Sequence, residues 1–266
     1  MERFKGQVIW VIGASSGYGE ALARALADAG ALLILSARRY GRLRDIAASL
    51  TAQAKVVPLD LAEPEAFDAK VAAAIACFGH IDRVIFTGAV AQNGTALATT
   101  PETARHIMAV DYVAYTELTR SLLPHFLARE SGHIVVTSGL LATLTLPGRS
   151  SYAAAKAALH GYFGCLRAEV LSAGIAVTLL VPGALDTELT RHALNAAGEA
   201  LNTPPSGTGC AVAVAAEQSL QAIAAQVYEA YIGIEDASYR LWRLTRADPN
   251  KGMAMLLASL PQVNHK

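Results

Sequence analysis

Residues 7–19 decide the fold, and they read QVIWVIGASSGYG. The first six form a short apolar run typical of a buried strand, and residues 19–29 repeat apolar side chains at helical spacing. The turn between them has glycines at 13, 17 and 19, which permit a tight turn and let an anion approach the helix N-terminus. We therefore predict a strand–turn–helix unit with a phosphate site, although a purely structural turn is the alternative.

The same alternation of strand and helix continues along the chain. We predict further strands at 32–36, 56–59, 84–87, 134–138 and 175–181, and helices at 42–50, 64–77, 101–129, 151–172 and 212–231. The strands are continuous apolar runs, as expected where helices cover both faces of a parallel sheet. The pattern predicts an α/β protein, a single Rossmann-type domain over 1–266 with a doubly wound parallel sheet of six or seven strands. Its ligand is expected beyond the carboxyl ends of the strands.

The pattern becomes less regular after the last predicted strand. Residues 187–210 include the turn-rich stretch 202–209 and are a candidate lid over a substrate. Residues 211–266 are expected to form a C-terminal helical extension.

Composition excludes some functions and favours others. Hydrophobic residues make up 53% and charged residues 17%, which favours a soluble homo-oligomer. The formal net charge is zero, so we expect no nucleic-acid partner. No segment has the roughly 18 apolar residues of a membrane span, so we expect no membrane association and a cytoplasmic location. Cys77, Cys165 and Cys210 are scattered, and we expect buried thiols rather than a disulfide or a metal site.

The glycine spacing resembles that of one family. Short-chain dehydrogenases/reductases open with Thr-Gly-x-x-x-Gly-x-Gly, and this chain has the same spacing after Ile12. The order of elements over about 7–187 also matches. The resemblance implies hydride transfer between a nicotinamide cofactor and a carbonyl or alcohol, in a homodimer or homotetramer. Cofactor contacts are expected at Gly13, Ser15, Ser16, Gly17, Tyr18 and Gly19.

Two arginines follow the second predicted strand. An NAD enzyme usually has an acidic residue here for the ribose 2′-hydroxyl, whereas this chain has Arg38 and Arg39. The planar guanidinium group suits a phosphate, so the pair predicts NADP(H) as the cofactor. In the family, the position of Arg38 is the usual phosphate contact. A solvated pair of charges is the alternative.

Three later segments resemble cofactor contacts of the family. Asp60-Leu61 resembles a pair near the adenine, with a helix cap as the alternative role. Phe86 and Thr87 stand where the family has two asparagines, while Gly88 keeps a small residue. Residues 182–187, PGALDT, match Pro-Gly-x-x-x-Thr, which holds the nicotinamide carboxamide. The implied contacts are Asp60, Leu61, Gly88, Pro182, Gly183, Leu185 and Thr187.

Tyr152 and Lys156 are four residues apart, on one face of a predicted helix. A nearby ammonium group lowers a phenol pKa by about 1–3 units from about 10, which suits general acid/base work. Such a pair also occurs by chance on helix surfaces. Here it resembles the catalytic pair of the family, so Tyr152 is expected as the acid/base and Lys156 as a further contact to the nicotinamide ribose.

Two positions depart from the catalytic residues of the family. Its substrate-polarising serine usually precedes the tyrosine by thirteen residues, which is Gly139 here. Ser138 is a poor substitute, because a shift of one residue along a strand reverses the side chain. Asp111 stands at the asparagine position. Its carboxylate, which accepts hydrogen bonds but cannot donate one, is expected to hold a relay water or to pair with Lys156, with a solvated residue as the alternative.

The sequence thus predicts an NADP(H)-dependent oxidoreductase acting on a carbonyl/alcohol substrate. Loss of a positioned donor costs roughly a hundredfold to a thousandfold in rate. The alternatives are therefore reduction of C=N or activated C=C bonds, for which the Asp111 carboxylate would stabilise a cation, or a cofactor-binding regulatory protein with little turnover. Leucines near the expected pocket favour a hydrophobic or aromatic substrate. They are Leu140, Leu141, Leu144 and Leu146.

Overall fold

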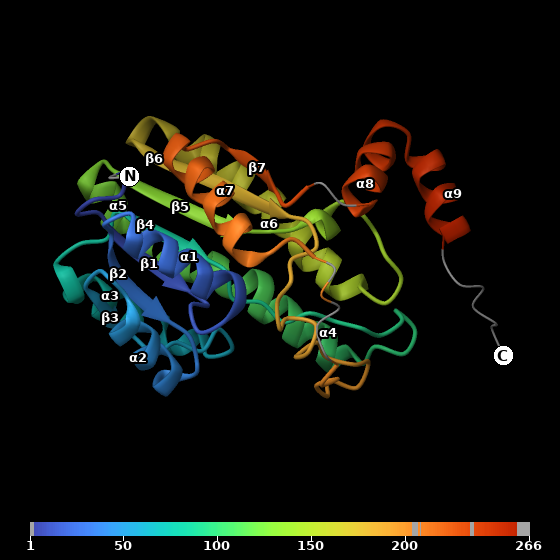
Figure 1. Ribbon diagram of the computed structural model, residues 1–266, viewed down its shortest axis with the longest axis horizontal. Helices are drawn as coiled ribbons and strands as arrows, with labels where there is room; N and C mark the ends of the chain where they lie inside the picture. The colour runs from blue at the N-terminus through green and yellow to red at the C-terminus, as the bar shows by residue number, and fades with distance from the viewer. Residues whose placement is uncertain (1–2, 204–206, 208, 235–236, 260–266) are drawn as a thin grey trace.

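The computed structural model describes residues 3–203, 207, 209–234 and 237–259. Within them, seven parallel strands form one sheet, as the sequence predicted (Figure 1). In spatial order they are β3 (Ala54–Val56), β2 (Leu32–Ser36), β1 (Val8–Ile12), β4 (Arg83–Phe86), β5 (Gly132–Thr137), β6 (Ile175–Pro182) and β7 (Glu229–Ile232). The order reverses between β1 and β4, which is where ligands bind in doubly wound sheets.

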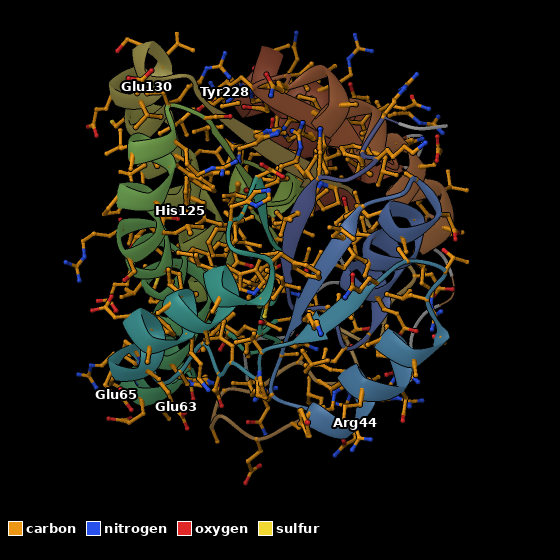
Figure 2. The ribbon with its side chains drawn as sticks, turned by 90° about the vertical axis from the view of Figure 1, so that its left-hand side faces the viewer. Arg44, Glu63, Glu65, His125, Glu130 and Tyr228 are labelled. Atoms are coloured by element: carbon orange, nitrogen blue, oxygen red, sulfur yellow. The ribbon has the colours of Figure 1, made fainter. Side chains whose placement is uncertain are left out.

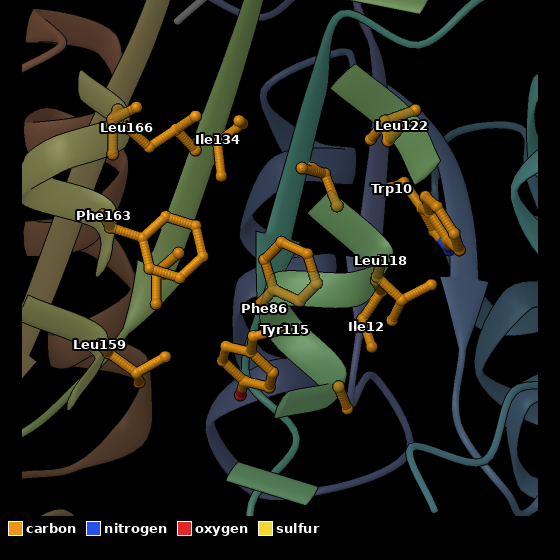
Figure 3. Packing of buried hydrophobic residues seen from close by; sticks show 14 of the residues in the cluster. Trp10, Ile12, Phe86, Tyr115, Leu118, Leu122, Ile134, Leu159, Phe163 and Leu166 are labelled. Atoms are coloured by element: carbon orange, nitrogen blue, oxygen red, sulfur yellow. The ribbon is translucent and has the colours of Figure 1, made fainter. Parts of the chain in front are cut away.

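Helices cover both faces of the sheet in a single Rossmann domain. On one face lie α3 (Phe67–Phe78), α5 (Ala114–Arg129) and α6 (Ser150–Val170), and on the other α1 (Gly17–Asp28), α2 (Tyr40–Ser49) and α7 (Val212–Ala225). Neighbouring residues of β1 point to opposite faces, so Trp10 belongs to the first core and Val11 to the second. In the first core, Tyr115 lies against Phe86 (Figure 3).

The long helix predicted at 101–129 has an internal irregularity. It consists of α4 (Pro101–Met108), a π turn η2 (Ala109–Val113) and α5. A π turn inserts an extra residue into a helix and often occurs at functional sites. This one contains Asp111, which it buries completely. Three short turns complete the helical elements of the described residues: η1 (Pro64–Ala66), η3 (Leu140–Ala142) and η4 (Leu171–Ala173).

The C-terminal part differs from the expected helical extension. The helix predicted at 212–231 is wrong in its second half, because α7 ends at Ala225 and Gln226 takes a left-handed conformation with φ of 51°. The chain then forms β7 at the edge of the sheet, before α8 (Ala237–Ala247) and α9 (Pro249–Ser259), which lie at one end of the molecule (Figure 1). A four-residue edge strand is too short to show a period in the sequence.

Two smaller expectations were also wrong. The third strand lies at 54–56 rather than 56–59. The cysteines are not buried, since Cys165 is exposed and Cys77 and Cys210 are partly exposed, and all three are free thiols. Cys165 lies on the exposed side of α6, whereas Cys77 in α3 packs against the margin of the first core.

The candidate lid at 187–210 is described except at 204–206 and 208, and it is held to the body of the domain around Leu194 and Ala196. The nitrogen of Leu194 donates to the oxygen of Ala91 at 2.9 Å, and the nitrogen of Asn93 donates to the oxygen of Leu194 at 2.8 Å. A third backbone bond joins Thr100 to Ala196 at 2.9 Å. These bonds fasten the segment to the loop that follows β4.

Charges of both signs lie on the outer surface. Arg44 of α2, Glu63 before η1 and Glu65 within it extend outward, on the side of the molecule where the structure also exposes Glu130 (Figure 2). This mixture agrees with a formal net charge of zero. Among the described helices, none has the length and apolar character needed to cross a membrane.

Candidate active site

A cavity of about 550 Å³ opens beyond the carboxyl ends of the strands, at the reversal between β1 and β4. All the residues expected to contact a cofactor line it: Gly13, Ser15, Ser16, Gly17, Tyr18, Gly19, Arg38, Arg39, Asp60, Leu61, Gly88, Tyr152, Lys156, Pro182, Gly183, Leu185 and Thr187. The volume falls within the range of small-molecule and cofactor sites. The structure therefore brings distant segments of the chain together at one site.

The glycine turn is packed too tightly for side chains. A Cβ atom at Gly13 would lie 2.4 Å from the nitrogen of Gly88, and one at Gly19 would lie 2.3 Å from the oxygen of Gly13. Thr87, which replaces an asparagine of the family pattern, fills the space beside both and donates to the oxygen of Ile12 at 2.8 Å. The turn thus leaves a backbone cradle at the N-terminus of α1, which fits the pyrophosphate of a dinucleotide.

The two arginines after β2 have different surroundings. Arg39 is fastened over the glycine turn, with Nη2 donating to Ser16 Oγ at 2.7 Å and to Ser15 Oγ at 3.0 Å. Arg38 lines the cavity, is exposed, and makes no side-chain hydrogen bond or ion pair with the described residues. Its donors remain available to a phosphate at the cavity mouth.

Two of the expected contacts also have structural roles. The Tyr18 hydroxyl forms a 2.5 Å hydrogen bond with Ser219 Oγ of α7, so its hydroxyl joins two helices rather than facing a ligand. Burial raises the pKa of Tyr18, which keeps this hydroxyl protonated. Asp60 accepts from the nitrogen of Ala62 at 3.0 Å, which closes a turn in the loop before η1. It does not cap a helix, the role considered as its alternative, because the N-cap position of η1 is Glu63. Both residues still line the cavity.

Asp111 and Lys156 form a buried ion pair. Lys156 Nζ lies 3.6 Å from Asp111 Oδ2 and 3.4 Å from the oxygen of Thr137, and the two side chains are 1% and 0% exposed. Asp111 Oδ1 accepts from the nitrogen of Val90 at 2.8 Å, while Oδ2 has no hydrogen-bond partner. Of the roles expected for Asp111, the structure shows the ion pair with Lys156. Asp111 does not line the cavity.

This pairing changes the electrostatics of Tyr152. Burial raises the pKa of Tyr152 and the Asp111 carboxylate raises it further, while Arg149 opposes the shift. The expected lowering by Lys156 is absent, because its positive charge is balanced by Asp111. Burial lowers the pKa of Lys156 itself, and Asp111 partly reverses that effect. Tyr152 therefore holds its proton at neutral pH and is poised to donate it.

Ser138 does not replace the serine that is absent at position 139. Its hydroxyl lies 2.8 Å from His160 Nε2 and 3.2 Å from the oxygen of Lys156, so it is hydrogen-bonded to two groups of α6. A Cβ atom at Gly139 would meet only the oxygen of Pro182, at 3.8 Å. The site thus lacks the serine hydroxyl and has room for it, as the one-residue shift predicted.

Two positioning residues were missed at the sequence level. Gln92 is completely buried, and its Oε1 accepts from the nitrogen of Ser151 at 2.8 Å and from that of Tyr152 at 3.4 Å. Tyr115 donates to the oxygen of Gly88 at 2.6 Å, which fixes the loop after β4. Gln92 belongs to no motif, and its contact with α6 spans about sixty residues. For Tyr115 the sequence offers one signal: it is an aromatic residue one helical turn after Asp111, so a helix places both side chains on the same face.

Comparison with known proteins identifies relatives over most of the chain. A family model described as short chain dehydrogenase matches residues 7–198. Dehydrogenase/reductase SDR family member 7B of Mus musculus is 36% identical over 201 residues, which cover 73% of this chain and 62% of that protein. The match thus spans about three fifths of its length. Dehydrogenase/reductase SDR family protein 7-like of Anopheles gambiae is 34% identical over 229 residues, 82% of this chain and 72% of that protein.

Solved structures share the fold. A short chain dehydrogenase from Burkholderia cenocepacia in complex with NADP has a TM-score of 0.80 and 27% identity, over 98% of this chain and all of that one. A short chain dehydrogenase/reductase from Burkholderia phymatum in complex with NAD has the same TM-score and 21% identity, over 94% and 96% of the two chains. Because these neighbours hold different dinucleotides, the likeness does not decide between NAD and NADP.

Proposed function

The chain belongs to the short-chain dehydrogenase family, and on that premise we propose that it is an oxidoreductase that uses NADPH to reduce a carbonyl group. One observation carries the proposal: a single cavity unites the glycine cradle, Arg38 and Tyr152. Within the same proposal, the protein is a cytoplasmic homodimer or homotetramer.

The residues divide the work as follows. NADPH, when bound, supplies the hydride. Residues of the glycine turn hold its pyrophosphate, and Arg38 binds its 2′-phosphate. Lys156 bonds the ribose, and Tyr152 donates a proton to the carbonyl oxygen of the substrate. The raised pKa of Tyr152 favours this reductive direction, because a phenol that keeps its proton acts as an acid rather than a base.

The alternatives have less support. Reduction of a charged C=N bond was considered because a carboxylate beside the substrate would stabilise the cation. Asp111, however, is buried, paired with Lys156 and outside the cavity lining. A regulatory protein without turnover would have no need for Tyr152 and Lys156, which the fold brings to the cofactor cavity. Carbonyl reduction thus remains the proposed activity.

Replacing Arg38 by alanine is expected to weaken NADPH binding about tenfold to a hundredfold and to leave NADH binding unchanged. A hydrogen bond to a charged group contributes about 1.5–3 kcal/mol, and only NADPH carries the phosphate. Fluorescence titration with both dinucleotides measures the effect. Arg39→Ala is the matched control and should weaken both, because Arg39 supports the turn itself. Equal losses for both dinucleotides in Arg38→Ala would contradict the NADPH assignment.

Replacing Gly139 by serine is expected to raise kcat on simple ketones by roughly a hundredfold to a thousandfold. The open space at this position accepts the side chain, and a donor to the developing oxyanion has an effect of this size. The steady-state rate of NADPH oxidation is the measurement, with Gly139→Ala as a control for volume. If serine and alanine behave alike, the hydroxyl is not what limits the reaction.

A further inference from the structure

Arg149 is a cation of the cavity that the proposed mechanism does not use. It lies immediately before α6, three residues ahead of Tyr152, and lines the cavity with a half-buried side chain. Its Nη1 donates to the backbone oxygen of Gln92. Since Gln92 Oε1 also caps the first turn of α6, one buried residue fixes Arg149 and Tyr152 relative to each other.

No carboxylate of the described residues forms an ion pair with Arg149. Of the acidic side chains that line the cavity, Glu188 pairs with Arg191 at 3.1 Å, Asp60 accepts from the nitrogen of Ala62, and Asp186 forms no ion pair within the described part of the chain. Asp111 lies outside the lining and pairs with Lys156. Burial lowers the pKa of Arg149, and its interaction with Tyr152 opposes that shift, so the guanidinium group is partly desolvated and lies near the phenol. A desolvated cation without a counterion is costly, and an anionic ligand group would relieve that cost.

The cavity also has a group of apolar lining residues. Leu140, Leu144, Leu146 and Leu189 line it. The guanidinium group has five donors in a planar fork that matches a carboxylate, and only Nη1 is engaged by Gln92. The cavity therefore combines one anion-binding group near the proton donor with an apolar wall, and it lacks a serine hydroxyl at Gly139.

We propose, resting on the proposed function, that the substrate is an oxo acid with an apolar remainder. Its carboxylate lies next to the reacting carbonyl or one carbon further away, and Arg149 binds it. The carbonyl carbon receives the hydride of NADPH and the carbonyl oxygen receives the Tyr152 proton. The product is the hydroxy acid, NADPH becomes NADP⁺, and the carboxylate is unchanged. Arg149 thus selects the substrate and holds its carbonyl beside Tyr152 without a serine.

The first test compares acids with their neutral esters. Benzoylformate and benzoylacetate are each assayed beside their methyl esters, with NADPH oxidation as the readout. The wild-type kcat/KM is expected to favour at least one acid over its ester by roughly tenfold to a hundredfold. Arg149→Leu should reduce this ratio to about one, mainly through a higher KM for the acid, and Arg149→Lys should keep part of it. Arg105→Leu, on the exposed surface of α4, is the control and should keep the full ratio. Wild-type preference for both esters would overturn the proposal.

A binding measurement separates this inference from the proposed function. Calorimetric titration of benzoylformate into the protein with NADP⁺ requires no turnover. Binding that is tenfold or more weaker in Arg149→Leu than in the wild type supports carboxylate recognition, even if neither acid nor ester is reduced, in which case only the proposed reaction fails. Equal binding by the wild type and by both Arg149 variants overturns the role of Arg149. Thermal unfolding of each variant verifies that it is folded.

Discussion

Tyr152→Phe is expected to lower NADPH-dependent turnover by roughly a hundredfold to ten-thousandfold, the usual contribution of a positioned acid. The substitution keeps the ring and its packing but removes the hydroxyl that holds the transferable proton. Burial and Asp111 raise the pKa of this phenol, so the wild-type acid stays protonated through the neutral range. We therefore expect carbonyl reduction to persist at neutral and mildly alkaline pH, and the reverse oxidation to need more alkaline conditions.

The experiment monitors NADPH oxidation over a panel of ketones, imines and enones, with NADPH affinity measured separately by fluorescence. Affinity should change little, because the glycine turn and Arg38 are untouched. Tyr162→Phe is a matched control, since Tyr162 belongs to the same helix, packs against Phe163 and lies outside the cavity lining. Full turnover in Tyr152→Phe would exclude this residue as the proton donor.

Local patterns explain what the sequence could predict. Apolar strands, the glycine turn and the four-residue spacing of Tyr152 and Lys156 are short-range features, and apart from the third strand each was found where the sequence placed it. The β7 strand was missed because its four residues are mostly half-buried, and they continue the helical pattern of α7. The short-range signal is therefore strongest where an element is long or buried on both faces.

The features that the sequence could not predict depend on contacts between segments that are distant along the chain. Gln92 reaches the start of α6 across about sixty residues, and Arg149 returns to the backbone of Gln92. The pairing of Asp111 with Lys156 was one of several alternatives, and only the fold shows that both are buried. Burial at Asp111 depends on the π turn and on the loop after β4, which supplies the nitrogen of Val90. No spacing of residues along the chain predicts the burial of Asp111.

The buried Asp111 is expected to make stability depend on pH. Burial raises its pKa to about 6, despite the opposing effect of Lys156, whereas an unfolded aspartate titrates near 3.9. The folded state thus binds this proton more tightly, so the contribution of Asp111 to stability is present below about pH 4 and is lost as pH rises through about 6. A shift of about two units corresponds to about 3 kcal/mol.

The opposite effect of His133 must be separated from it. Burial and Arg83 lower the pKa of His133 to about 3, so its contribution is present above about pH 6.5 and is lost as pH falls. The informative quantity is therefore the unfolding free energy of the wild type minus that of Asp111→Asn, in which His133 is common to both.

This difference should fall by about 3 kcal/mol between pH 4 and pH 6.5, measured by urea unfolding at several pH values. Asparagine keeps an oxygen that can accept from the nitrogen of Val90, so the variant removes the charge with little change in shape. Lys156→Met is the complementary variant. It removes the charge that lowers the Asp111 pKa, so the corresponding fall should again begin near pH 4 but continue to higher pH and become larger. A difference that stays constant across this range would contradict the raised pKa of Asp111.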